Sequence, residues 1–276
     1  DRVLVEEPSY FLALRIFADH GLQVESLPTD GDGLLPDALE ESLRRTRPVF
    51  LYAVPTYQNP SGATLPEERR QRLLELAQEH DLLLITDEVY HLLSYGRAAP
   101  PTFAGRTQRA KVLSLGTFSK ILAPGLRLGW IAAQPALLQP LVSCGFLDSG
   151  GGLAPFTSAV VRSAVERGEL ATHLQRLRRT YGERAAAMTA SLKHHLGRAV
   201  SFAEPQGGFF HWVDLGSDLD SERLLPLARE GGVSFVPGVR FSSCRGQRSR
   251  LRLSFSYYDP PQIEEGIKRL AAALEG

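Results

Sequence analysis

Residues 114–130 read SLGTFSKILAPGLRLGW, and this stretch decides how the rest of the chain is interpreted. Its single lysine, Lys120, lies in a polar turn between two apolar runs that are typical of β-strands. Thr117 and Ser119 precede the lysine, and Arg127 follows a proline-glycine break. Because proline fixes one backbone angle and glycine permits sharp turns, the loop can bring these polar groups together.

A ligand with an anionic group and a reactive carbonyl would suit this loop. Hydroxyls and a guanidinium bind phosphate oxygens, and a lysine amine forms a covalent bond with an aldehyde. Pyridoxal phosphate carries an aldehyde and a phosphate in one molecule. An isolated lysine is more often a solvated amine, so the choice between these interpretations depends on the rest of the chain.

The composition is that of an ordinary globular protein, with 43% hydrophobic and 22% charged residues among 276. This length suffices for one large domain or a large domain plus a small one. The 31 basic residues balance the 31 acidic residues, so overall charge favours neither nucleic acid nor an anionic membrane. No apolar run approaches the ~20 residues of a membrane span, and the seven histidines fit no metal-binding spacing. We expect Cys144 and Cys244, which form no CxxC pair, to be free thiols in the cytoplasm.

Strands alternate with helices over the first half of the chain. Apolar runs predict strands at 3–5, 23–27, 49–54, 82–86, 112–115 and 128–133. Helical spacing predicts helices at 10–20, 36–45 and 66–80. This order predicts an α/β fold with a mainly parallel sheet flanked by helices.

The pattern changes near residue 149. The glycines at 150–152 predict a hinge or a close-approach loop, and long helices are expected at 155–166 and 169–195. Strands at 209–213, 233–236 and 251–254 with helices at 221–230 and 261–274 then predict a small α+β C-terminal domain. We therefore expect a large domain at 1–165, a connecting helix at 166–195 and a small domain at 196–276.

Four polar clusters follow predicted strands, namely Tyr10, Asn59, the segment 87–90 and the Lys120 loop. Each has a commoner structural explanation when taken alone: a core tyrosine, an Asn-Pro turn, a helix cap and a solvated amine. Ligands of open α/β sheets bind at the carboxyl ends of the strands. Convergence of all four clusters at one edge therefore predicts a ligand site.

The motifs PTYQNPSG, ITDEVY, GTFSK with PGLRLGW, and LRLSFS together resemble the class I/II aminotransferases of the fold-type I pyridoxal-phosphate superfamily. They are most similar to the 2-aminoadipate and broad-specificity subgroup, whose catalytic domain also occurs in MocR-type regulators. The match covers nearly the whole chain in order. It implies pyridoxal 5'-phosphate as cofactor and an amino acid and a 2-oxo acid as substrates.

The resemblance implies a role for each cluster. Lys120 would hold the cofactor covalently and then act as the general base. Asp87 would pair with the pyridine nitrogen; composition alone leaves Asp87 and Glu88 open, and the family pattern selects Asp87. Tyr90 and Asn59 would hydrogen-bond the phenolic oxygen of the cofactor.

The remaining implied contacts concern the ring face, the phosphate and the substrate. Tyr10 would lie against the cofactor ring. Thr117 and Arg127 would hold the phosphate with help from Ser119. Arg252 in LRLSFS would grip the α-carboxylate of the substrate and so fix its orientation.

Further expectations concern the neighbours of these residues. Asn59 would share in substrate binding with Arg252, and the Asn59–Pro60 peptide bond is expected to be cis. We expect Arg248 and Arg250, which flank the same strand, to be solvated.

The leading interpretation is an aminotransferase that moves an amino group from an L-amino acid to a 2-oxo acid by a ping-pong mechanism. A lyase or decarboxylase on the same scaffold, or the effector domain of a MocR-like regulator, would keep the same cofactor residues. Balanced charge gives no support for nucleic-acid binding through this chain. The resemblance also implies a homodimer in which residues 150–156 approach the neighbour's phosphate.

Members of the family normally have well over a hundred residues ahead of the position that matches Asp1. These residues include a glycine-serine turn that binds the phosphate at a helix N-terminus and a tyrosine donated across the dimer. They also include a strand that would lie beside residues 128–133. We therefore expect the chain to be part of a longer protein.

Overall fold

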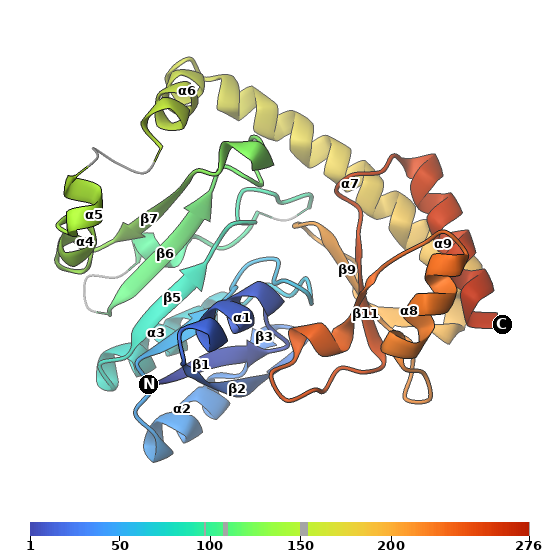
Figure 1. The fold of residues 1–276 in the computed structure, drawn as a ribbon, viewed down its shortest axis with the longest axis horizontal. Helices are drawn as coiled ribbons and strands as arrows, with labels where there is room; N and C mark the ends of the chain where they lie inside the picture. The colour runs from blue at the N-terminus through green and yellow to red at the C-terminus, as the bar shows by residue number, and fades with distance from the viewer. Residues whose placement is uncertain (97, 107–109, 150–153, 276) are drawn as a thin grey trace.

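The computed structural model, which describes residues 1–96, 98–106, 110–149 and 154–275, has two lobes joined by a long helix. A seven-stranded sheet forms the large lobe, and a four-stranded sheet forms the small lobe. Helix α7 (Glu169–His195) runs from one lobe to the other (Figure 1). The N-terminus lies in the large lobe and the C-terminus in the small lobe.

The large sheet has the strand order β3-β2-β1-β4-β5-β6-β7 in the described part of the chain. Its central strands, from β2 to β6, are parallel, whereas the edge strands β3 and β7 are antiparallel to their neighbours. This arrangement confirms the predicted mainly parallel α/β sheet. The strand bounds are β1 (Arg2–Glu7), β2 (Gln23–Asp30), β3 (Gly33–Leu34), β4 (Phe50–Ala53), β5 (Leu83–Asp87), β6 (Val112–Thr117) and β7 (Gly129–Ala133).

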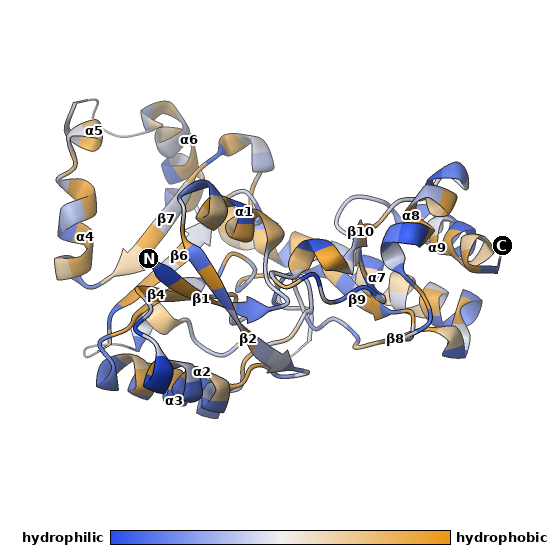
Figure 2. Ribbon diagram, turned by 60° about the horizontal axis from the view of Figure 1, so that its bottom comes forward, coloured by the Kyte–Doolittle hydropathy of each residue, from blue (hydrophilic) through white to orange (hydrophobic). Residues whose placement is uncertain are grey.

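Helices cover both faces of this sheet (Figure 2). On one face, Leu4, Leu51 and Leu84 pack with leucines of α2 (Pro36–Arg45) and α3 (Glu67–Glu79). Since successive side chains of a strand point to opposite faces, the next residue of each strand faces the other way. Burial on both faces explains why these strands read as continuous apolar runs.

The opposite face carries α1 (Phe11–Asp19). There Val5, Tyr52 and Ile85 pack together with Ala13 of that helix. Tyr10, which follows β1, packs against the same cluster, so this face of the sheet adjoins the predicted site.

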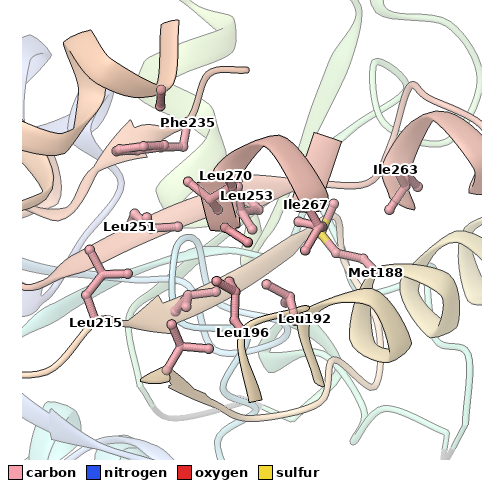
Figure 3. Packing of buried hydrophobic residues seen from close by; sticks show 14 of the residues in the cluster. Met188, Leu192, Leu196, Leu215, Phe235, Leu251, Leu253, Ile263, Ile267 and Leu270 are labelled. Carbon is pink, nitrogen blue, oxygen red and sulfur yellow. The ribbon is translucent and has the colours of Figure 1, made fainter. Parts of the chain in front are cut away.

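The small lobe is built on the sheet order β10-β11-β9-β8, which is antiparallel throughout. Figure 3 shows its core, in which leucines of β11 pack against α9 and the C-terminal half of α7. The element bounds are β8 (Ser201–Phe202), β9 (Phe210–Asp214), α8 (Ser221–Glu230), β10 (Val236–Pro237), β11 (Arg250–Ser254) and α9 (Pro260–Glu275).

Helix α7 belongs to both lobes. Its C-terminal half contributes Met188 and Leu192 to the core of the small lobe. Its N-terminal half packs Leu177 and Tyr181 against a cluster at the junction of the lobes. Arg178 of the same half donates from Nε to the Leu92 carbonyl oxygen at 2.8 Å. The helix thereby ties the two sheets together.

Differences from the sequence-based expectation include one predicted strand and two helices that were not predicted. The predicted strand at 233–236 is wrong for its first residues, because only Val236 and Pro237 join the sheet. Helices α4 (Pro135–Val142) and α5 (Gly145–Asp148) precede α6 (Pro155–Glu166) and were not predicted. Proline at both ends of the α4 segment obscured its helical period. The glycines predicted to form a hinge at 150–152 lie outside the described residues.

Strand β7 forms one edge of the large sheet in the described residues, and its pairing with β6 depends on Gly116. Gly116 pairs with Trp130, whose indole lies over the glycine and 4.8 Å from the Phe118 ring. A Cβ atom at residue 116 would lie 2.0 Å from the indole. Glycine is therefore required there so that the indole can close over the strand that leads to Lys120.

We expect Gly116→Ala to destabilise the protein by about 1–2 kcal/mol, since the indole must leave its place. Urea denaturation followed by tryptophan fluorescence measures this change. Gly31→Ala is the matched control, because a Cβ atom at residue 31 meets nothing within 4 Å. Equal stability of the two variants would contradict the prediction.

Candidate active site

The structure brings the predicted strand-end residues to one edge of the large sheet. Strands β1, β4, β5 and β6 are consecutive neighbours. Their carboxyl ends lead to Tyr10, Asn59, Asp87 and Lys120, respectively. The charge of Asp87 acts to raise the pKa of Tyr10, Tyr90 and Lys120, as is expected of side chains near one another at this edge.

Asp87, which is half-buried, supplies the carboxylate of this site. The Tyr52 hydroxyl donates to Asp87 Oδ2 at 2.6 Å, whereas Oδ1 is buried without a hydrogen-bond partner among the described residues. Burial raises the pKa of Asp87, and the Tyr52 hydrogen bond, the Val89 amide and the Lys120 charge act against this increase. Asp87 thus presents one free oxygen to the site.

Glu88, the alternative that composition left open, faces the opposite side of the chain. Ser114 Oγ donates to its carboxylate at 2.6 Å, and the Phe103 amide donates to it at 3.1 Å. The buried Arg70 guanidinium lies 3.8 Å away. Because its oxygens are bound within this network, Glu88 stabilises the fold, and Asp87 remains the carboxylate of the site.

Lys120 lies half-buried in the loop after β6. Burial lowers the pKa of its amine, and the positive charges of Arg127 and Arg252 act in the same direction, whereas Asp87 opposes them. A lowered pKa increases the fraction of neutral amine, which is the form that attacks a carbonyl or accepts a proton.

The loop around Lys120 is organised by its hydroxyl residues. Thr117 Oγ1 accepts from the Ser119 amide at 3.1 Å. Arg127 Nη1 donates to Ser119 Oγ at 3.3 Å and to the Pro124 carbonyl oxygen at 3.3 Å. Arg127 has a φ of 49°, an uncommon left-handed conformation for a residue other than glycine. The loop thus holds a guanidinium and two hydroxyls beside the lysine.

Arg252 enters the site from β11 of the small lobe. Its Nη1 donates to Asn59 Oδ1 at 2.6 Å, which joins the two lobes. The guanidinium stacks on the Phe210 ring at 4.0 Å and lies 4.8 Å from the Phe241 centroid. Burial lowers the pKa of Arg252 to about 10, so the group stays charged at neutral pH. Its Nε is buried without a partner among the described residues.

The aromatic residues that hold Arg252 were missed by the sequence analysis. Phe210 and Phe241 come from the small lobe, and Phe11 lies 5.9 Å from the guanidinium in the large lobe. Phenylalanines in apolar segments look like ordinary core residues, so the sequence carried no signal for this role. Tyr52 was missed for the same reason.

Tyr10 and Tyr90 contribute two phenols to the site. Burial raises the pKa of both hydroxyls, Asp87 acts in the same direction and Arg252 opposes it. Both side chains are therefore neutral at physiological pH and able to donate a hydrogen bond. The Tyr90 ring also packs edge-on against Phe209 with centroids 5.3 Å apart.

The flanking expectations agree with the structure. The Asn59–Pro60 peptide bond is cis, as predicted. Arg250 pairs with Asp214 at 3.0 Å on the surface, and Arg248 is similarly exposed. Cys144 and Cys244 are exposed free thiols.

A second buried acid holds the loop that carries Asn59. Glu6 Oε2 accepts from the Val54 amide at 2.8 Å and from Gln58 Nε2 at 3.3 Å. Gln58 also donates to the Pro8 carbonyl oxygen at 2.7 Å. The residue before Asn59 is therefore fixed to the end of β1.

These residues fit pyridoxal phosphate. The free Oδ1 of Asp87 is an acceptor for a protonated ring nitrogen, and Lys120 is an amine for the aldehyde. The exposed guanidinium of Arg127 and the nearby hydroxyls suit a phosphate. The unpartnered Nε of Arg252 is a donor that a substrate carboxylate can use.

Metal centres and membrane spans are both absent from the described ranges. Histidine, cysteine and carboxylate side chains there form no group of three or more that could hold a metal ion. Every helix in the same ranges is too short or too polar to cross a membrane.

Comparison with known proteins identifies the family to which the chain belongs. The family model for aminotransferase class I and II matches residues 1–270. The chain belongs to the class I and II aminotransferases.

Named relatives match this aminotransferase over its whole length, which spans about two thirds of their own. Aromatic-amino-acid aminotransferase 1 of Thermococcus litoralis is 35% identical over all of this chain, which covers 67% of that relative. The crystal structure of the kynurenine aminotransferase of Pyrococcus horikoshii is 36% identical with a TM-score of 0.94, over 100% of this chain and 69% of that one. LysN, the α-aminoadipate aminotransferase of Thermus thermophilus, was solved with N-(5'-phosphopyridoxyl)-L-leucine. It is 37% identical with a TM-score of 0.93, over 100% of this chain and 71% of LysN.

Transcriptional regulators match this aminotransferase less closely. YisV of Bacillus subtilis, named as an uncharacterised HTH-type regulator, is 28% identical over 98% of this chain and 55% of the regulator. The predicted resemblance to the aminoadipate and MocR-like subgroup, the fold-type I architecture and the aminotransferase activity are confirmed by these matches.

The buried Glu6 predicts a pH dependence of stability. Burial raises its pKa from 4.5 to about 8. Below pH 4.5 the carboxyl is protonated in both folded and unfolded states. Between pH 4.5 and 8 the unfolded chain releases the proton and the folded chain retains it, so this group lowers stability as the pH rises. Above pH 8 the cost stays constant.

We expect Glu6→Gln, which keeps an acceptor oxygen but cannot ionise, to gain Tm relative to the unmodified protein by several degrees between pH 5 and 8. Thermal melts across this range measure the difference. Glu41→Gln changes an exposed carboxylate and should give a nearly constant difference. A difference for Glu6→Gln that does not change with pH would disprove the assignment.

Proposed function

We propose that this aminotransferase binds pyridoxal phosphate at Lys120 and moves an amino group from an L-amino acid to a 2-oxo acid in two half-reactions. One observation carries the proposal: three groups lie together in one site. They are the Lys120 amine, whose pKa is lowered, the unpartnered Oδ1 of Asp87, and the Arg252 guanidinium that Asn59 holds by a hydrogen bond. The bound cofactor supplies an electron-accepting ring that stabilises a carbanion at the substrate Cα.

Arg252 orients the substrate. Its planar fork can bind both oxygens of an α-carboxylate, and the Phe210 and Phe241 rings hold the guanidinium in place before substrate arrives. Asn59 Oδ1 already engages one nitrogen, so the carboxylate binds beside this hydrogen bond. A fixed carboxylate determines which bond of Cα is aligned for cleavage.

Lys120 moves the proton. Its amine would take the Cα proton of the bound amino acid and pass it to the C4′ carbon of the cofactor, and it would carry a proton in the opposite direction when the 2-oxo acid reacts in the second half-reaction. Burial and the charges of Arg127 and Arg252 lower the pKa of this amine, which favours its neutral form at physiological pH.

Asp87 and the two polar groups near the ring tune the cofactor. Asp87 Oδ1 would accept from the protonated ring nitrogen and so keep that nitrogen charged. Tyr90 and Asn59 would hydrogen-bond the phenolic oxygen, and Tyr10 would lie against the ring. The neutral state of both phenols supports these roles.

The phosphate is held by the Lys120 loop. Arg127 would supply a charge-assisted hydrogen bond, and the hydroxyls of Thr117 and Ser119 would supply further donors. The existing contact between Arg127 and Ser119 supports a shared anion site. In this proposal the left-handed backbone of Arg127 serves to aim the guanidinium at the loop.

The names of the relatives support the proposed substrate class. Those relatives are named for aromatic amino acids, kynurenine and α-aminoadipate, so an L-amino acid with a large side chain is the proposed donor. The aminotransferase is proposed to act in the cytoplasm as a homodimer, with small-molecule substrates as its other partners.

Covalent trapping tests the cofactor site. The purified protein is mixed with pyridoxal phosphate, reduced with borohydride and digested, and the labelled peptide is identified by mass spectrometry. A label on Lys120 together with a visible absorbance band before reduction supports the proposal. A label on another lysine, or none, argues against it.

We expect Lys120→Ala to lower multiple-turnover transamination by at least about 10⁴-fold, because the covalent link and the base are removed together. Turnover is measured with a panel of amino donors and 2-oxoglutarate. Lys111→Ala is the control, since Lys111 pairs with Asp81 on the surface. Undiminished turnover by Lys120→Ala would end this proposal.

We expect Arg252→Gln to lower kcat/KM for the amino acid by about 100-fold, because the carboxylate loses a bidentate charged partner. Arg250→Gln removes an arginine two residues away on the same strand that pairs with Asp214. Its kcat/KM should stay within about threefold of the unmodified enzyme. Steady-state kinetics measure kcat/KM for both variants. A similar loss of kcat/KM in the two variants would refute the role of Arg252.

A further inference from the structure

Tyr52 is a buried phenol to which the proposed function assigns no role. It lies on β4 with 4% of its surface exposed. It packs with Val5 and Val54, and its ring lies edge-on to Phe17 with centroids 5.6 Å apart. Its hydroxyl donates to Asp87 Oδ2 at 2.6 Å. This packing leaves the phenol little freedom to point elsewhere.

The register of the sheet explains this contact. Tyr52 pairs with Ile85 on the neighbouring strand β5, and Asp87 lies two residues beyond Ile85. Side chains two residues apart on a strand share a face, so Tyr52 and Asp87 lie on the same side of the sheet. The phenol ring spans the diagonal distance, and its terminal oxygen makes the hydrogen bond.

The hydrogen bond makes the two oxygens of Asp87 inequivalent. Oδ2 has a partner, whereas Oδ1 is buried without one among the described residues. A buried carboxylate oxygen without a partner carries a desolvation cost, which a bound donor removes. The protonated ring nitrogen of the cofactor is such a donor.

We propose that Tyr52 is a positioning residue that fixes the Asp87 carboxylate so that Oδ1 receives the cofactor's ring nitrogen. This inference rests on the proposed function and names a residue that acts on the cofactor only through Asp87. Tyr52 makes no direct contact with the ring in this assignment.

The charge states of the pair support the assignment. Burial raises the pKa of Tyr52 well above 10, and Asp87 raises it further, so the phenol remains a neutral donor. A donor to the carboxylate favours the ionised form of Asp87 against the effect of burial. Loss of the donor therefore weakens the electrostatic partner of the ring nitrogen.

The test compares two cofactors. Tyr52→Phe removes one oxygen and keeps the aromatic packing. Dissociation constants are measured by absorbance titration for pyridoxal phosphate and for its 1-deaza analogue, in which a C–H group replaces the ring nitrogen. We expect Tyr52→Phe to weaken binding of pyridoxal phosphate about tenfold and of the analogue less than twofold, because only the former engages Asp87 through its nitrogen.

A matched control separates positioning from general damage. Tyr95→Phe removes a phenol whose hydroxyl donates to the Gly208 carbonyl oxygen, away from Asp87. It should leave the ratio of the two dissociation constants unchanged. Circular dichroism and the Tm of the cofactor-free variants show whether each protein is folded.

The outcomes distinguish this inference from the function on which it rests. Equal weakening of both cofactors by Tyr52→Phe, or no weakening of either, would overturn the positioning role while leaving the proposed function in place. Failure of the unmodified protein to bind pyridoxal phosphate at Lys120 would instead overturn the proposed function, and this inference with it.

Discussion

The site depends on one constraint, which is that a carboxylate must stay ionised while half-buried at the end of β5. Burial opposes the charge of Asp87, so the surrounding strands must supply compensation. The Tyr52 hydroxyl provides it from β4, and the Lys120 amine provides it from the loop after β6. The parallel order of these strands is what brings the groups together, since all of them end at the same edge. The parallel order of the strands is therefore required both for the fold and for the charge of Asp87.

Two acidic neighbours at the end of β5 have different surroundings. Asp87 faces the site with a free oxygen, whereas Glu88 is bound by Ser114 and lies close to Arg70. Glu88 is buried and Asp87 is half-buried, and burial raises the pKa of each. The two residues differ in their hydrogen-bond partners. Both carboxylate oxygens of Glu88 have partners within the protein, whereas Oδ1 of Asp87 has none among the described residues. An unsatisfied buried acceptor is a property of a binding site rather than of a core.

Much of the fold could be predicted from the sequence, because strands and helices leave a periodic pattern of apolar residues. Apolar runs predicted the strands, and the polar clusters after them located Asn59, the segment 87–90 and Lys120, whereas the family resemblance selected Asp87 over Glu88. The roles of Tyr52 and Phe210 could not be read, since an aromatic residue in an apolar run signals only burial until its neighbours across the sheet are known. The α4 helix was missed because its prolines mask the helical period. Sequence thus locates the groups that carry charge, and tertiary structure is needed for the groups that orient them.

The proposed base and the proposed carboxylate-binding residue lie on different lobes, and α7 packs against both lobes. Lys120 belongs to the large lobe, Arg252 belongs to the small lobe, and α7 packs into each. A helix of 27 residues is about 40 Å long and behaves as a stiff lever. A tilt of about 5° around its middle displaces its end by about 2 Å, which is comparable to the length of a methylene or two. Because Tyr181 packs against the hydrophobic clusters of both lobes, its contacts hold α7 at one angle and thereby hold Arg252 at a fixed distance from Lys120.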